Sequence, residues 1–69
     1  MNDELLHIVV MIWDSGDYDV CLYSDGREKE CLHTVDTWSK AQQLARAECR
    51  DLGFGVFTTE RIKQHMVKL

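Results

Sequence analysis

A nine-residue apolar run near the start of the chain constrains the fold more than any other segment. Residues 5–13 read LLHIVVMIW and end at the turn-forming sequence Asp14-Ser15-Gly16-Asp17. A short apolar run that is rich in β-branched residues and closed by turn residues is typical of a strand buried on much of both faces. We therefore predict a central strand here, because an edge strand this apolar would pair with other chains.

A β-hairpin is predicted after this strand. Residues 18–23 alternate along the chain as expected for a strand with one apolar face, and Asp25-Gly26 separates them from a returning strand over residues 28–34. Asp-Gly between two strand-like runs is a strong hairpin signal, because glycine tolerates the positive φ that tight turns require.

The register of this hairpin has two solutions. A two-residue loop places Val20 opposite Cys31, and a three-residue loop with a bulge places Val20 opposite Glu30. We favour the first, because it turns Cys31 toward the core and leaves Glu28 and Glu30 outside.

An amphipathic helix over residues 38–52 is the clearest element of the second half. Asp36 or Thr37 can cap its first turn, and Gly53 follows its last turn. Its apolar residues recur every three or four positions and predict one buried face that packs on the sheet: Trp38, Ala41, Leu44, Ala45, Cys49 and Leu52. On this basis Leu52→Ala is expected to cost about 2–5 kcal/mol of stability.

The remaining residues predict a short strand over 53–58 and a tail that fits a short helix better than a strand. The predicted fold is thus α+β, with β-β-β-α-β order. A small antiparallel sheet is covered on one face by one amphipathic helix, a short C-terminal helix follows, and residues 1–69 form one compact domain.

Charge is distributed unevenly along the 69 residues, whose net charge is −4. Residues 1–36 carry nine acids and two bases, and residues 37–69 carry three acids and six bases. Acidic residues are common at turns for structural reasons alone. As a functional hypothesis, the hairpin and its flanks form a negative partner-binding patch with one aromatic anchor: Asp14, Asp17, Asp19, Tyr23, Asp25, Glu28 and Glu30.

A basic face on the helix and tail is the alternative binding surface. It consists of Lys40, Arg46, Arg50, Arg61 and Lys63. Basic residues on one side of a small domain can contact nucleic-acid phosphates. The acidic half would repel phosphate, however, so we expect direct nucleic-acid binding to be the less favoured function.

Catalytic, metal and targeting signals are not evident in the sequence. The three histidines lie in separate elements, and the three cysteines form no Cys-x-x-Cys pair. Cys31-x-His33 offers two ligands of the four that a structural zinc site needs, and the other ligands would have to come from Cys21, Cys49, His7 or His65. We therefore expect a non-enzymatic protein with reduced, metal-free cysteines and no cofactor. The acidic start and the absence of a transmembrane-length apolar run favour a cytoplasmic location without membrane association.

Two resemblances accompany these patterns. Residues 18–58 resemble short uncharacterised bacterial domains in which a hairpin leads to a helix: the shared features are Tyr18-x-Val20, Asp25-Gly26, Asp36-Thr37, Ala41-x-x-x-Ala45 and Gly53. In its small size, acidity and lack of catalytic residues, the chain resembles phage-encoded anti-CRISPR proteins, which share no common motif.

The anti-CRISPR resemblance implies an inhibitor that binds a basic, nucleic-acid-binding surface of a larger protein or ribonucleoprotein complex in the host cytoplasm. The alternative is a bacterial nucleic-acid-binding or regulatory module that uses the basic face. The sequence leaves open whether the protein is a monomer or a dimer.

Overall fold

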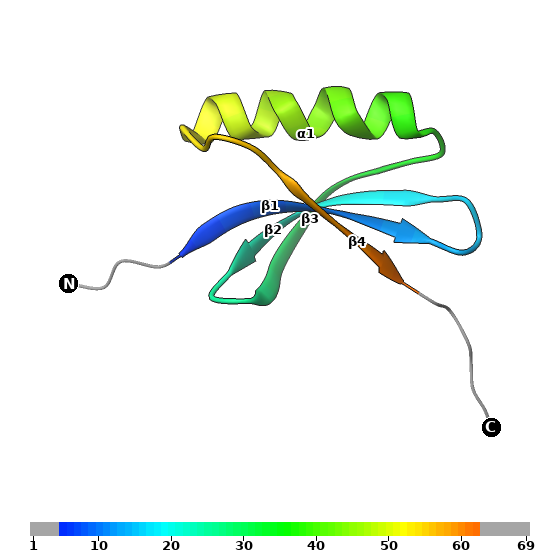
Figure 1. Cartoon of the computed structure of the whole chain (residues 1–69), viewed down its shortest axis with the longest axis horizontal. Helices are drawn as coiled ribbons and strands as arrows, with labels where there is room; N and C mark the ends of the chain where they lie inside the picture. Colours follow the sequence, from blue (N-terminus) through cyan, green and yellow to red (C-terminus); the bar gives the residue numbers. More distant parts are fainter. Residues whose placement is uncertain (1–4, 63–69) are drawn as a thin grey trace.

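The computed structural model describes residues 5–62 and has one helix packed on a four-stranded sheet (Figure 1). The predicted α+β class and β-β-β-α-β order are confirmed. The sheet order is β3-β2-β1-β4, and α1 lies along one face. The elements are β1 (Leu6–Trp13), β2 (Tyr18–Ser24), β3 (Arg27–Val35), α1 (Trp38–Leu52) and β4 (Thr58–Ile62).

The apolar run forms β1, which is a central strand as predicted. It pairs with β2 antiparallel on one side and with β4 parallel on the other. Ile8 and Val10 are completely buried on one face, and Val9 is 3% exposed on the other. The sheet is therefore mixed: its first three strands are antiparallel, and the chain crosses over through α1 before β4 joins in parallel.

The hairpin turn has the predicted two-residue loop. Asp25 and Gly26 both have positive φ, at 55° and 83°, which is the conformation of a type I′ turn. This turn matches the right-handed twist of the flanking strands, so Ser24 pairs directly with Arg27.

The register away from the turn differs from both predicted solutions. Two irregularities, between Leu22 and Tyr23 and between Val20 and Cys21, each shift the pairing by one residue. As a result Val20 lies opposite His33. Because an extra residue in one strand moves the following side chains to the other face, the predicted burial of Cys31 is wrong, and Cys31 is exposed.

Both ends of α1 lie at the predicted residues. Thr37 is the N-cap, and its hydroxyl accepts a hydrogen bond from the Lys40 backbone N–H at 3.2 Å. Gly53 has a left-handed φ of 79°. The N–H groups of Gly53 and Phe54 donate to the carbonyls of Arg50 and Cys49, which satisfies two carbonyls of the last turn in a Schellman motif.

The main core lies between α1 and the sheet. Its buried residues are Ile8, Val10, Val20, Ala41, Ala45 and Cys49. The small helix residues let α1 approach the strands closely, and the first and last residues of the helix lie at the margin of this core. The predicted core roles of Trp38 and Leu52 therefore need correction, because they are 37% and 44% exposed. The Trp38 ring instead contacts Tyr18 and Phe57, with centroids 5.7 and 6.4 Å apart.

The last predicted strand and the tail are also corrected. Residues 53–57 form a turn and loop, and the strand begins only at Thr58 and continues to Ile62. Phe54 and Phe57 anchor this loop on the helix-side core. Residues 59–62 are therefore strand where a helix was predicted, since pairing with β1 satisfies their backbone. The rest of that predicted helix, 63–69, lies outside the described residues.

Candidate protein-binding face

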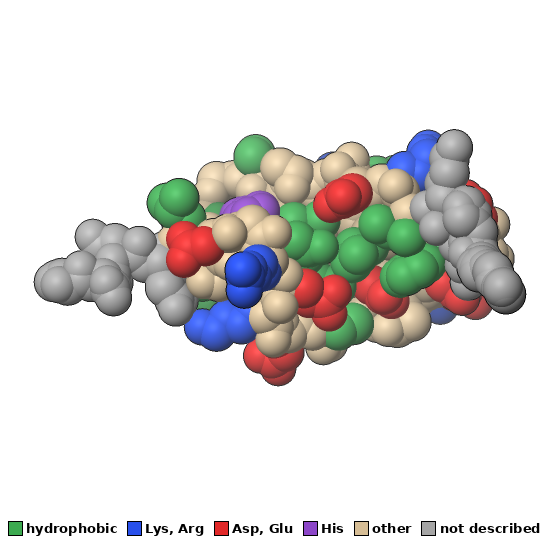
Figure 2. All heavy atoms as spheres, turned by 90° about the horizontal axis from the view of Figure 1, so that it is seen from below, with side chains coloured by type: hydrophobic (Ala, Val, Ile, Leu, Met, Phe, Trp, Pro, Cys, Tyr) green, Lys and Arg blue, Asp and Glu red, His purple; other side chains and the backbone are tan. Residues whose placement is uncertain are grey.

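The sheet face that α1 leaves open carries a second apolar cluster, which we call the open-face cluster. Val9, Met11 and Cys21 are buried in it, and three partly buried side chains complete it: Trp13, Tyr23 and Ile62. Figure 2 views this face from below and shows hydrophobic side chains along its middle with carboxylates beside them. No helix of residues 5–62 covers this face.

The same apolar run that makes β1 central also produces this face. Successive strand residues point to opposite sides, so Ile8, Val10 and Ile12 face the helix while Val9 and Met11 face away. An alternating sequence would have given a polar outer face. The uninterrupted run instead gives the sheet two apolar faces, of which α1 covers one.

Contacts to the Met11 sulfur organise the middle of the open-face cluster. The Cys21 thiol donates to Met11 Sδ at 3.7 Å, and the Tyr23 hydroxyl donates to the same sulfur at 3.8 Å. The Tyr23 ring also packs against His7, with centroids 5.6 Å apart. Methionine is flexible and polarizable, and such surfaces adapt readily to a partner.

Two carboxylates flank the tyrosine on this face. Glu28 lies opposite Tyr23 on β3, and Glu60 lies opposite Met11 on β4. Burial raises the pKa of Tyr23, and the negative charges of Glu60 and Glu28 raise it further. The two acids thus act on the same aromatic side chain from opposite sides, Glu28 from the adjacent strand β3 and Glu60 from β4, which lies beyond β1.

Asp19 is the third acid of this face, and its carboxylate is held in place. Trp13 Nε1 donates to one Asp19 oxygen at 3.0 Å, and Thr34 Oγ1 donates to the other at 2.9 Å. These bonds connect β1, β2 and β3 through one half-buried charge. Held charges of this kind need little reordering when a partner binds.

The other predicted acids lie elsewhere. Asp14 and Asp17 are exposed in the β1–β2 turn, and Asp25 occupies the turn at the opposite end of β2, about 20 Å away for a strand of this length. Glu30 lies opposite Leu22, a residue that packs toward the helix. The structure thus brings only Asp19, Tyr23 and Glu28 of the predicted patch together on the open face.

Local hydrogen bonds involve two of the turn acids. Ser15 Oγ donates to Asp17 Oδ2 at 3.3 Å. The Leu5 N–H donates to Asp25 Oδ1 at 3.2 Å, and the Asp25 N–H donates to the Leu5 carbonyl at 3.0 Å. These contacts give Asp17 and Asp25 structural roles in closing the turn and in fixing the start of β1.

Six residues of this face were not among the predicted site residues: Val9, Met11, Trp13, Cys21, Glu60 and Ile62. The signal for the three residues on β1 was present, because an apolar run without alternation implies a second apolar face. Glu60 and Ile62 could not be found in this way, since their place on the face depends on β4 pairing with β1.

The predicted basic residues do not form one continuous surface. Lys40 is 3.8 Å from Asp36 in an exposed ion pair, Arg61 is exposed on β4, and Lys63 lies outside the described residues. Arg46 and Arg50 do lie together. With Cys49 and residues 54–57 they line an open groove of about 590 Å³ between α1 and the loop that follows it.

Among the histidines of residues 5–62, His33 lies within hydrogen-bonding distance of a carboxylate. Its Nε2 lies 2.8 Å from Glu48 Oε2, so this pair connects β3 to α1 on the helix side of the sheet. The bulge that turns His33 toward the helix leaves Cys31 on the open face. The two potential ligands of the Cys31-x-His33 sequence are therefore separated by the sheet.

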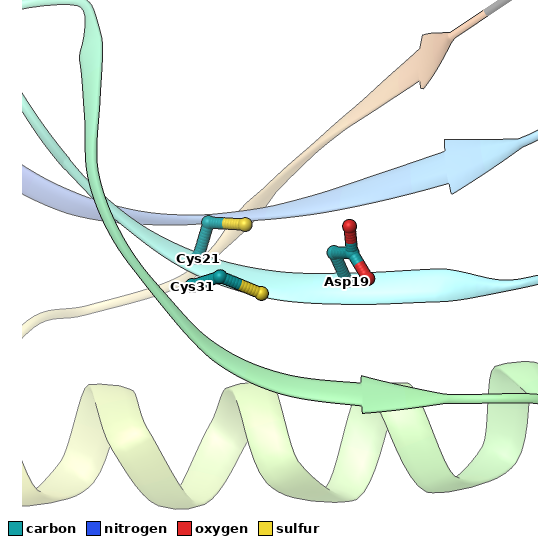
Figure 3. Close-up of side chains that lie close together, drawn as sticks. All are labelled: Asp19, Cys21 and Cys31. Carbon is teal, nitrogen blue, oxygen red and sulfur yellow. The ribbon is translucent and has the colours of Figure 1, made fainter. Parts of the chain in front are cut away.

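Cys31 has a different neighbour on the open face. It pairs directly with Cys21 across β2 and β3, and Asp19 precedes Cys21 by two residues on the same face (Figure 3). The two sulfurs and an Asp19 carboxylate oxygen all lie within 4.8 Å of one another. Burial raises the pKa of the Cys21 thiol to about 12, with smaller contributions from Cys31, Glu28 and Asp19.

Comparison with known proteins gives no relative. No protein-family model, no curated protein and no solved structure matches the chain. In the part of the chain that the structure describes, no helix is long and apolar enough to span a membrane.

Proposed function

We propose that this chain is a small, non-enzymatic inhibitor that uses its open sheet face to bind a basic surface of a larger partner. The observation that carries the proposal is the open-face cluster together with its flanking acids Asp19, Glu28 and Glu60. Trp13, Tyr23 and Ile62 remain partly exposed on this face, and apolar surface beside charged residues is typical of a protein-interaction surface.

The composition of this face favours a protein partner over a small ligand. Trp13, Tyr23 and Met11 are residue types enriched at protein interfaces. The two aromatic side chains have their polar groups engaged within the face, so they present rigid apolar surfaces to a partner.

Charge determines which kind of protein partner fits. Three carboxylates on one face match lysine- and arginine-rich surfaces, and complementary charge accelerates association. Surfaces that hold nucleic-acid backbones are basic because they neutralise phosphates. A nucleic-acid-binding channel of a protein or ribonucleoprotein complex is therefore the partner surface that we favour.

The most concrete form of the proposal is an anti-CRISPR protein acting in the host cytoplasm. It rests on the resemblance in size, acidity and lack of catalytic residues, and on the match between an acidic face and the positively charged channel of a CRISPR effector. The alternative function, nucleic-acid binding through the basic side, is favoured by the two neighbouring arginines of the α1 groove, Arg46 and Arg50.

A phage-infection assay tests this function. The chain is expressed in a panel of bacterial strains, each with one active CRISPR system directed against the challenge phage. The proposal expects restored plaque formation in at least one strain and unchanged resistance in a matched strain that uses restriction instead. If plaque formation is restored in none of the CRISPR strains, the anti-CRISPR assignment is contradicted.

Variants of the two faces identify the working surface. Glu28→Lys with Glu60→Lys reverses charge on the open face, and Glu30→Lys is the matched control on the same strand as Glu28. We expect the first pair to abolish inhibition and the control to retain it. Arg46→Glu with Arg50→Glu should also retain it. Loss of inhibition with the arginine pair alone would favour the nucleic-acid alternative.

A further inference from the structure

We propose that Asp19, Cys21 and Cys31 form a binding site for Zn²⁺ on the open face of the sheet. The site combines two sulfurs and one carboxylate oxygen from β2 and β3, and these atoms lie within 4.8 Å of one another. Figure 3 shows the two cysteine side chains extending from neighbouring strands in the direction of Asp19. In the sequence, Cys21 was one of several possible partners of Cys31 in a zinc site, whereas Asp19 as a ligand follows only from the structure.

The donor atoms suit zinc. Thiolate sulfur binds Zn²⁺ at about 2.3 Å and carboxylate oxygen at about 2.0–2.2 Å, which places tetrahedral ligands about 3.5–3.8 Å apart. To reach that spacing, the most widely separated ligand atoms of this cluster must approach each other by about 1 Å. Rotation of the exposed Cys31 side chain supplies the part of this movement that concerns its own sulfur.

Hydrogen bonds already orient the proposed ligands. The two Asp19 oxygens accept from Trp13 Nε1 and Thr34 Oγ1, and the Cys31 sulfur lies 3.7 Å from the same Thr34 hydroxyl. Metal-binding carboxylates are commonly held by such hydrogen bonds, which fix their orientation. Each Asp19 oxygen keeps a further lone pair for a metal.

The local fold makes this arrangement possible. The register shift between the Val20 and Cys21 pairs places Leu32 and His33 on the helix side and leaves Cys31 and Thr34 on the open face. Cys31 thereby lies beside Cys21 instead of entering the core. Since Cys31 is exposed, the fourth zinc ligand is a water molecule or a group from a partner.

Zinc also changes the protonation of the site. Cys21 is buried and its thiol keeps its proton to high pH, so the metal must displace that proton when it binds. The positive charge of zinc then compensates the two thiolates and Asp19 in a partly buried position. Binding to the folded chain alone stabilises it, by an amount that grows with the logarithm of the free zinc concentration once this exceeds the dissociation constant.

Metal binding is tested with the full, untagged chain, treated with a chelator and kept in a phosphine reductant. After the chelator is removed and Zn²⁺ is added, native mass spectrometry should show one Zn²⁺ per chain, and competition with a chromophoric chelator gives the affinity. Co²⁺ should produce a thiolate-to-metal charge-transfer band. The melting temperature should rise on addition of Zn²⁺.

Matched variants locate the metal. Cys31→Ser removes an exposed ligand, and Cys49→Ala is the control because Cys49 lies on the helix side of the sheet. Zn²⁺ affinity should fall at least tenfold for Cys31→Ser and stay unchanged for Cys49→Ala. Thr34→Val should reduce it by about 10–100-fold, as expected for loss of a hydrogen bond to metal ligands.

Three results would overturn the proposal. The first is absence of stoichiometric Zn²⁺ in the reduced wild type. The second is equal affinity of the wild type and Cys31→Ser, which would place the metal elsewhere. The third is a disulfide between Cys21 and Cys31 that persists in the reductant, because it would remove both thiolate ligands.

Discussion

The packing of α1 can be tested by comparing two truncations, Val10→Ala in the core and Leu52→Ala at the helix end. Val10 is completely buried, and alanine removes two methyl groups worth about 0.8 kcal/mol each. A residual cavity of about 40 Å³ would add roughly 1 kcal/mol. We therefore expect a loss of about 2–3 kcal/mol, a large part of the roughly 3–10 kcal/mol typical of a domain this small.

Leu52→Ala removes more atoms and should nevertheless cost less. Leu52 is 44% exposed, so solvent fills the space and no enclosed cavity forms. We expect a loss of about 1 kcal/mol, below the range that its place in the apolar pattern of the sequence predicted.

Urea unfolding followed by circular dichroism gives the free energy of unfolding of each variant, and thermal unfolding gives the change in melting temperature. For a domain this size the Val10→Ala melting temperature should fall by about 10–20 °C. If Leu52→Ala destabilised the chain as much as Val10→Ala, α1 would have to be rotated or shifted along the sheet, and the described packing would be wrong.

Three further predictions concern the helix end and the thiols. Gly53→Ala should lower stability by about 1–2 kcal/mol, measured by urea unfolding, because its φ of 79° is unfavourable for residues with a Cβ; an unchanged stability would exclude this cap. In native buffer, iodoacetamide should modify the exposed Cys31 much faster than the buried Cys21 and Cys49, as followed by peptide mass spectrometry, and equal rates would contradict the described burial. The pKa of Cys21 is raised from 9.0 to about 12, so the folded chain holds this proton more tightly than the unfolded chain, and stability should be full below pH 9 and fall between pH 9 and 12. Melting temperatures over that range should show a smaller fall for Cys21→Ala, and a rise with pH in the wild type would contradict the assignment.

Local signals in the sequence predicted the helix to the residue. The Thr37 hydroxyl, the left-handed Gly53 and the spacing of apolar residues between them are all properties of neighbouring residues. The central position of β1 was predictable for a similar reason, since an apolar run of strand length needs cover on both faces.

Features that depend on pairing between distant segments were not predictable. Thr58–Ile62 forms a strand because β2 pairs with only one side of β1, and the backbone groups on the other side of β1 are available to β4. In isolation the same residues fit a helix. The bulges of β3 depend on packing: Leu32 enters the helix-side core and His33 contacts Glu48, which shifts the register around them. A register shift of one residue changes the face of every side chain that follows.

Only part of the candidate site was predicted, because the face on which a strand residue lies depends on the pairing of distant segments. Asp19, Tyr23 and Glu28 were named from their density along the hairpin, and they do share a face. Glu30 was named on the same grounds and lies opposite a helix-side residue instead, because its face depends on the register. The apolar cluster between the acids needed the topology of the whole sheet.

The most direct test of the proposed binding face is the affinity of the chain for a CRISPR effector whose activity it blocks in the infection assay, measured by biolayer interferometry. The wild type is compared with Glu28→Lys/Glu60→Lys and with Glu30→Lys at about 0.1 M and 1 M salt, between which the Debye length shrinks about threefold. We predict that the double variant binds at least tenfold more weakly, that Glu30→Lys binds like the wild type, and that the wild type weakens as salt rises. Equal affinity of the wild type and the double variant, together with salt-independent binding, would show that the open face is not the binding surface.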